Sequence, residues 1–172
     1  MSAKIFTPNV CEHCHQTTDY ALALDRGTAM IVIAFVNAVR RLGRNRVHIH
    51  GEMIAQNEGG RSHIEMIHAG YMTPIMEHNV VRPRYHGLIA FVDKGSGEYL
   101  LTRKGADFLR GHPVQRVAII DKVAGRNSGY LESAGTVTIG ELLRKDADMW
   151  AGNMSDIRAS LEVPEFTEPL LI

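Results

Sequence analysis

The residues with the clearest chemical potential are Cys11 and Cys14, which form a CxxC motif near the N-terminus. They are the only cysteines in the 172-residue chain, so no disulfide framework of a secreted fold can be built from them. Two cysteines placed at random would show this spacing on the order of one time in a hundred. The spacing lets both thiolates bind one zinc ion, which needs two further ligands. We therefore predict a structural zinc knuckle within residues 1–18.

Histidine is the plentiful source of further ligands, with nine in the chain. His48 and His50 lie two apart on a predicted strand over 47–50, so their side chains should share a side and complete a Cys₂His₂ site with Cys11 and Cys14. A pair of reduced thiols beside scattered surface histidines is the simpler alternative. A redox role is disfavoured, because thioredoxin-type motifs follow a strand and open a helix. Other histidines that could serve as ligands are His13, His15 and His112.

No catalytic motif accompanies these residues. The sequence contains no HExxH, Walker loop, G-x-S-x-G or dinucleotide fingerprint, and no spacing of Asp and Glu assigns an acid and a base. We predict that the protein is not an enzyme, with a metalloenzyme that uses the histidines as the weaker alternative.

The charges are distributed unevenly although the formal net charge is zero. Residues 26–126 contain 15 Lys and Arg against 8 Asp and Glu, whereas residues 127–172 contain 3 against 8. A basic central block predicts a polyanionic partner, while the zero total disfavours strong non-specific DNA binding. The longest wholly apolar run, 29–36, is too short for a bilayer and follows acidic residues, which excludes a secretory signal and predicts a cytoplasmic protein.

Helix signals then organise the chain. The pattern over 18–42 is helical, although Gly27 weakens its first part. Residues 28–42 are apolar almost all round, which predicts a long buried helix that ends at Gly43. Ser62 and Glu65 form a capping box for a helix of two turns that Gly70 closes. Thr73 followed by a proline starts a second short helix. Two short helices around a glycine turn predict a helix-turn-helix.

The continuation predicts a hairpin and another helix. Leu88–Val92 and Glu98–Leu101 are β-rich runs around the turn Lys94–Gly97, and Thr102 caps a helix over 103–110. The sequences HGLI at 86–89 and YLLTRKG at 99–105 resemble those of bacterial winged-helix regulators of the multiple-antibiotic-resistance type. The chain also resembles uncharacterised phage and prophage proteins that pair an N-terminal CxxC with such a block. The resemblance covers about 50 residues well and implies a winged helix that binds double-stranded DNA.

We therefore predict a nucleic-acid interface on the second short helix and the hairpin. The apolar side of this helix is predicted to be Ile75, Met76 and Val80. Asn suits adenine and Arg suits guanine in a major groove, while Lys and Arg at the hairpin and next helix suit phosphates. Glu77, on the same helix, would repel the phosphates. Pro83 should push Arg82 out of the helical region and end the recognition helix near Val81, which leaves fewer side chains for base reading. The candidate residues are His78, Asn79, Arg82, Arg84, Lys94, Arg103 and Lys104.

The predicted fold class is α+β. It comprises a CxxC segment over 1–18, a winged-helix core over 19–123, and a C-terminal extension over 124–172 with an acidic tail from Glu162 that could cover the basic face. The predicted function is nucleic-acid binding or transcription regulation with a structural zinc ion. A protein-interaction module that docks its winged helix on a partner protein is the alternative.

Overall fold

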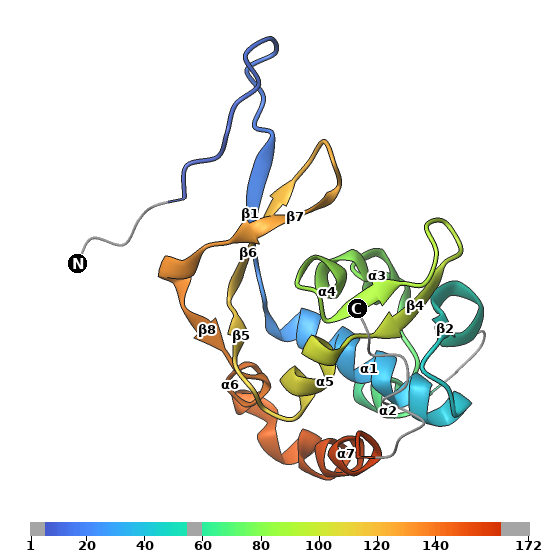
Figure 1. The fold of residues 1–172 in the computed structure, drawn as a ribbon. Coiled ribbons are helices and arrows are strands. Elements are labelled where there is room, and N and C mark those ends of the chain that lie inside the picture. Colours follow the sequence, from blue (N-terminus) through green and yellow to red (C-terminus); the bar gives the residue numbers. More distant parts are fainter. Residues whose placement is uncertain (1–5, 55–59, 163–172) are drawn as a thin grey trace.

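The computed structural model describes residues 6–54 and 60–162, and it shows a mixed α+β fold. Helices gather around one central helix, α1, and three small β-sheets lie at the edges of this helical body (Figure 1). Among the described residues, no helix is both long enough and apolar enough to cross a bilayer.

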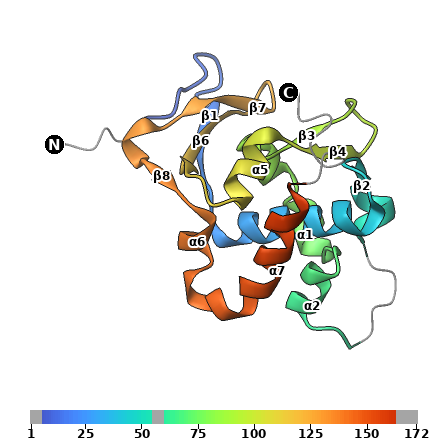
Figure 2. The ribbon, with the colours of Figure 1, turned by 60° about the horizontal axis from the view of Figure 1, so that its bottom comes forward.

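Helix α1, Arg26–Leu42, is the centre of the core. Every residue from Thr28 to Val39 is buried. The helix begins where the Asp25 carboxylate accepts the Thr28 amide at 2.8 Å, and it ends at Gly43 in the left-handed conformation. Helices α2 (His63–His68) and α7 (Ala147–Ser160) pack along it (Figure 2), as do α4 (Val81–Tyr85) and α6 (Ile139–Leu142). An all-round apolar helix can be buried only if elements cover it on every side.

One sheet has the order β2-β4-β3, with both pairs antiparallel. Its strands are Val47–His48, Glu98–Leu101 and Ile89–Phe91 for β2, β4 and β3. In the chain, α2, α3 (Pro74–His78) and α4 lie between β2 and β3. Helix α5, Arg103–Leu109, follows β4 and begins at Thr102, as predicted.

The helix starts predicted from the sequence are confirmed. The Ser62 hydroxyl and the Glu65 carboxylate each accept the other residue's amide, which forms the capping box of α2. Thr73 caps α3, whose first residue is Pro74. Gly70 takes a positive φ of 79° after α2, where a Cβ would meet the backbone of Ala38 in α1.

Two local predictions are wrong. The strand over 47–50 ends at His48, and a π-helical turn, Ile49–Met53, replaces its second half. Pro83 does not expel Arg82 from a helix, because α3 ends at His78 and α4 restarts at Val81. Pro83 is then the third residue of α4, where a missing amide proton leaves no helical bond unmade.

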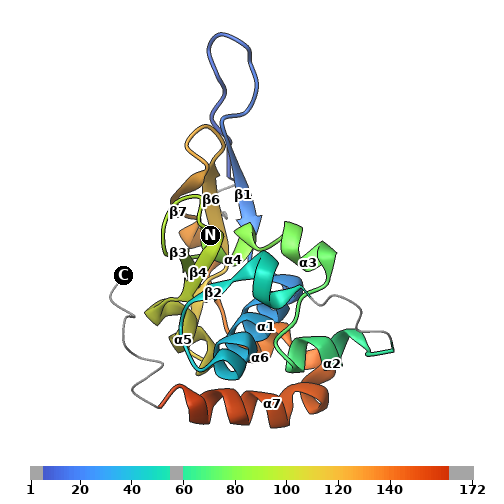
Figure 3. The same ribbon diagram turned by 90° about the vertical axis from the view of Figure 1, so that its right-hand side faces the viewer.

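A second sheet has the order β1-β6-β7, with strands Asp19–Ala23, Val117–Asp121 and Arg126–Tyr130. Strand β1 lies within 18–42, where the sequence pattern indicated helix. The sheet extends away from the helical body, and a hairpin of residues 9–18 continues from the free end of β1 (Figure 3). A third pair, β5 (Val114–Gln115) and β8 (Thr136–Val137), leads towards α6.

The expected C-terminal extension contributes to the same core as α1. Trp150 and Ile157 of α7 are almost completely buried. The Trp150 indole packs edge-on against the His68 ring of α2, with 5.2 Å between the centroids. The acidic tail beyond Glu162 lies outside the described residues.

His86, at the end of α4, is completely buried. Burial lowers its pKa to about 4, and the nearby charges of Lys104 and Arg82 act in the same direction. The unfolded chain, with an ordinary His pKa of about 6.5, therefore binds the proton more readily than the folded chain. The stabilising effect of the neutral imidazole is complete above about pH 6.5 and is lost as the pH falls towards 4.

We expect His86 to contribute about 3 kcal/mol to the loss of folding free energy between pH 7 and pH 4. Urea denaturation at a series of pH values measures this loss. His86→Leu should flatten the curve, whereas His78→Gln, at an exposed histidine, should leave it unchanged. Parallel curves for the wild type and His86→Leu would contradict the assignment.

Gly105, within α5, lies against the Leu88 carbonyl before β3. An added Cβ would be 2.1 Å from this oxygen and 2.8 Å from Leu101 Cδ1. We expect Gly105→Ala to destabilise the fold by about 3 kcal/mol or more, measured by urea denaturation. The matched control is Gly152→Ala in α7, where nothing lies within 4 Å of an added Cβ, and it should stabilise the fold by up to about 1 kcal/mol. Equal effects of the two substitutions would contradict this packing.

Candidate nucleic-acid interface and CxxC hairpin

Three of the predicted nucleic-acid-binding side chains are exposed to solvent. His78 ends α3, Lys94 lies in the turn between β3 and β4, and Arg103 begins α5. Within the described part of the chain, none of the three has a hydrogen bond or an ion pair from its side chain. Their charges and donors are therefore available to a ligand.

Arg82 and Arg84 instead bind within the protein. Arg82 forms an ion pair with Asp25 at 2.8 Å, which joins α4 to the N-cap of α1. The guanidinium of Arg84 lies 4.6 Å from the ring centroid of Tyr85 and 4.8 Å from that of Phe91. It also donates to the Gly125 carbonyl at 3.3 Å, beside β7. The last of these contacts links α4 to the turn between β6 and β7.

Asn79 and Lys104 are also engaged. The side-chain amide of Asn79 donates to the Ile75 carbonyl at 2.8 Å, one turn earlier in the chain, at the end of α3. The Lys104 ammonium donates to the Tyr130 hydroxyl at 2.7 Å and lies 4.2 Å from the centroid of that ring. The structure thus does not bring the seven candidates together on one exposed face. Contacts with residues distant in the sequence, Asp25 and Gly125, occupy the two arginines of α4.

Ile75 is the residue of this region that the sequence placed wrongly. Helical spacing put it on the apolar side of α3 with Met76 and Val80, but its side chain is 76% exposed while the other two are buried. It borders a pocket of about 310 Å³ between α3 and the first turns of α1, which Arg26 and Arg82 also line. The apolar pattern of the sequence does not indicate which of these three residues stays outside the core.

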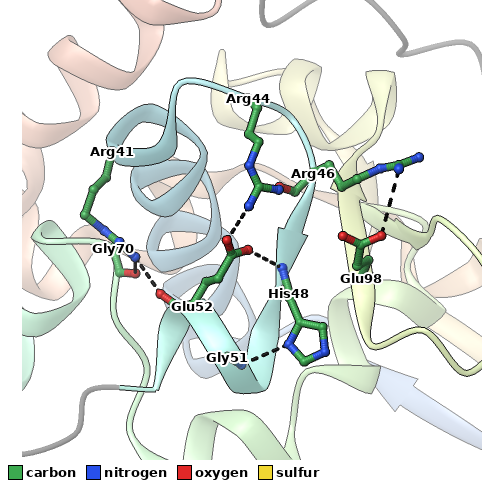
Figure 4. Close-up of polar contacts among 8 residues, drawn as sticks. All are labelled: Arg41, Arg44, Arg46, His48, Gly51, Glu52, Gly70 and Glu98. Carbon is green, nitrogen blue, oxygen red and sulfur yellow. Dashed lines mark hydrogen bonds and ion pairs between the residues drawn. The ribbon is translucent and has the colours of Figure 1, made fainter.

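The histidines of the predicted zinc site are engaged in the π-helical turn. His48 Nδ1 accepts the Gly51 amide at 2.9 Å, and the Glu52 carboxylate accepts the His48 amide at 2.7 Å (Figure 4). An Nδ1 that accepts a hydrogen bond places the proton of a neutral imidazole on Nε2, so no lone pair of the ring is free for a metal. His50 Nδ1 pairs with Glu77 of α3 at 2.8 Å.

Two arginines, one in the last turn of α1 and one just after it, also bind to this π-helical turn. Arg44 pairs with Glu52, and Arg41 donates to the carbonyls of Glu52 and Gly70 (Figure 4). The Glu52 carboxylate lies among these cations and the His48 amide. These contacts of Arg41 and Arg44 therefore fix the connection from α1 to β2.

The CxxC motif lies elsewhere, at the tip of the hairpin formed by residues 9–18 and beyond the end of β1 (Figures 1 and 3). His48 ends β2 and His50 lies in the π-helical turn that follows it, and β2 is at the right of the body in Figure 1, away from the hairpin at the top. In the described ranges, no group of three or more His, Cys, Asp or Glu side chains is arranged to hold a metal ion. Both cysteines and all nine histidines belong to these ranges.

The hairpin holds its two thiols in a tight turn. The Cys11 amide donates to the Gln16 carbonyl at 2.8 Å, and the His15 amide donates back to the Cys11 carbonyl at 2.9 Å. His15 is the only non-glycine residue in the described ranges with a positive φ, 56°. The backbone amides of Cys14 and then His13 hydrogen-bond to the Cys11 sulfur, and together with the Cys14 thiol they hold the pKa of Cys11 below its ordinary value.

Comparison of the chain with protein-family models, curated proteins and solved structures gives no match.

We expect the Cys11 thiol to ionise at a lower pH in the folded protein than in the unfolded chain, because the amide donors exist only in the folded turn. The rate of iodoacetamide alkylation against pH, measured by mass spectrometry on metal-free Cys14→Ser, reports this ionisation. The same variant in urea is the control and should show a higher midpoint. Equal midpoints would show that the turn does not activate the sulfur.

Proposed function

We propose that the protein is a winged-helix nucleic-acid-binding regulator. The observation that carries this proposal is the connectivity of the body. Helix α1, strand β2, helices α2, α3 and α4, and the β3–β4 hairpin follow one another in the chain, and β4 pairs between β2 and β3. Short helices inserted before such a hairpin are the arrangement with which winged helices place a helix and a loop against a duplex.

The exposed groups favour phosphate contacts over base reading. Lys94 extends from the β3–β4 turn, and His78 lies at the end of α3. Arg82 and Arg84, the side chains best suited to guanine, are held by Asp25 and by the rings of Tyr85 and Phe91. Lys and Arg contacts to phosphates position a protein on a duplex but carry no sequence information directly. We therefore expect salt-dependent binding with little sequence preference.

Fluorescence anisotropy with a mixed-sequence duplex, titrated at several salt concentrations, tests this proposal. Lys94→Ala should weaken binding and reduce the slope of log K against log salt by about 0.9, because one phosphate contact is lost. The matched control is Lys145→Ala, an exposed lysine next to α6, which lies away from the β3–β4 turn (Figure 1) and should leave the slope unchanged. Absence of wild-type binding at low salt, or equal slopes for both variants, would overturn the proposal.

A protein-interaction module is the second candidate, and the position of Ile75 favours it. An isoleucine that is 76% exposed on α3, beside a pocket, suits an apolar partner surface better than a phosphate backbone. This candidate predicts that duplex binding is absent even at low salt, so the anisotropy titration separates the two functions.

A further inference from the structure

We propose that the CxxC hairpins of two copies of this chain share one zinc ion, which Cys11 and Cys14 of each copy coordinate in a Cys₄ site. The two chains would then be joined at the tips of their hairpins. This inference is independent of nucleic-acid binding.

The hairpin already has the form of half a zinc site. Val10 and Thr17 form an antiparallel bridge, and the Thr18 amide donates to the Asn9 carbonyl at 2.8 Å. A non-glycine residue in the left-handed conformation at position 15 is uncommon and persists where the surrounding turn demands it. The turn thus brings the two cysteines together without any metal-dependent rearrangement of the rest of the chain.

The base of the hairpin is anchored to the β1-β6-β7 sheet. Asp19, at the start of β1, is buried and accepts the Asn9 backbone amide at 2.6 Å and its side-chain amide at 2.7 Å. Lys122, after β6, donates to the Thr17 hydroxyl at 2.7 Å. The tip is therefore held at a fixed distance from the helical body, which suits a ligand that must be presented to a second molecule.

The electronic environment suits a thiolate that binds a metal. Amide groups of Cys14 and His13 are directed at the Cys11 sulfur, where they stabilise negative charge. Zinc binds cysteine as the thiolate, and each thiol releases its proton to water on coordination. The same amides would act as outer-shell donors to the bound sulfur.

The described residues of one chain do not complete the site. A structural zinc ion takes four ligands, and the described residues bring no third His, Cys, Asp or Glu side chain into position with the two thiols. Strand β2 and the turn after it, which contain His48 and His50, lie away from the hairpin (Figure 1), and the ring nitrogens of these histidines bond to Gly51 and Glu77. We therefore assign the remaining two ligands to another molecule.

A second copy of the chain is the occupant that this geometry favours. A two-fold axis through the metal would supply the same two sulfurs from each side and close the tetrahedron. The hairpin projects from the body, so two tips can meet without contact between the bodies (Figures 1 and 3). Val10, 52% exposed beside Cys11, would be covered at the joint. Because so little surface meets, the association should depend on the metal.

The experiment combines sedimentation equilibrium with elemental analysis of the tag-free full-length protein, loaded with zinc under a reducing agent that does not bind metals. We expect a dimer of the 19.1-kDa chain with one zinc ion per two chains. A strong chelator should return it to monomer, and so should Cys14→Ser. Circular dichroism of this variant should match the wild type, because the tip lies outside the core.

His13→Asn and His15→Asn are the matched controls, and both should retain the dimer and its zinc. Asn is among the residues that tolerate the left-handed conformation required at position 15. A monomer with one zinc ion per chain, lost in either histidine variant, would show a local site and overturn the proposal. A protein that binds no zinc, or a dimer that persists with chelator and in Cys14→Ser, would overturn it as well.

Discussion

The burial of α1 is the constraint on which the rest of the structure depends. Twelve consecutive residues, 28–39, are removed from water, so the helix has no solvent-facing side along most of its length. One neighbouring layer cannot cover such a helix. The fold recruits α2 and α4 from the middle of the chain and α6 and α7 from its C-terminal part. Regions that differ in charge and composition are thereby joined in one core.

The burial of α1 also explains where many of the basic side chains lie. Cations in the central block lie close to buried backbone carbonyls, aromatic rings and carboxylates at the edges of the core. Arg41 satisfies the Gly70 carbonyl near α1, and Arg84 covers the rings of Tyr85 and Phe91. A surplus of positive charge in the sequence is consequently smaller at the surface than the count suggests. Lys94 and Arg103 keep the charge that a polyanion would meet.

The β1-β6-β7 sheet has two roles in this arrangement. Strand β7 packs on the end of α4. There the side-chain amide of Asn127 donates to the Tyr85 carbonyl at 2.7 Å, and the Tyr130 hydroxyl donates to the His86 carbonyl at 3.3 Å. The outer end of the sheet carries the CxxC hairpin. The end of α4, beside the predicted base-reading residues Arg82 and Arg84, is thus used to attach the sheet that carries the two cysteines.

Local signals in the sequence determined much of the body. The caps at Ser62, Thr73 and Thr102 fix helix starts because their side chains accept from the amide three residues later, and such contacts need no distant partner. The β3–β4 hairpin follows from its own turn and β-rich runs. Strand β1 could not be predicted in this way, because its partner β6 lies about a hundred residues later and its pattern alone resembles the start of a helix.

The candidate site shows the same division. The sequence identified Cys11 and Cys14 as a pair, since their spacing is local, and it identified the cations by type. Only the tertiary structure decided that a π-helical turn follows His48, that Arg82 pairs with Asp25, and that Ile75 stays outside the core. Each of these outcomes depends on contacts between residues that are distant in the sequence. Residue type and local spacing do not indicate which of those contacts form.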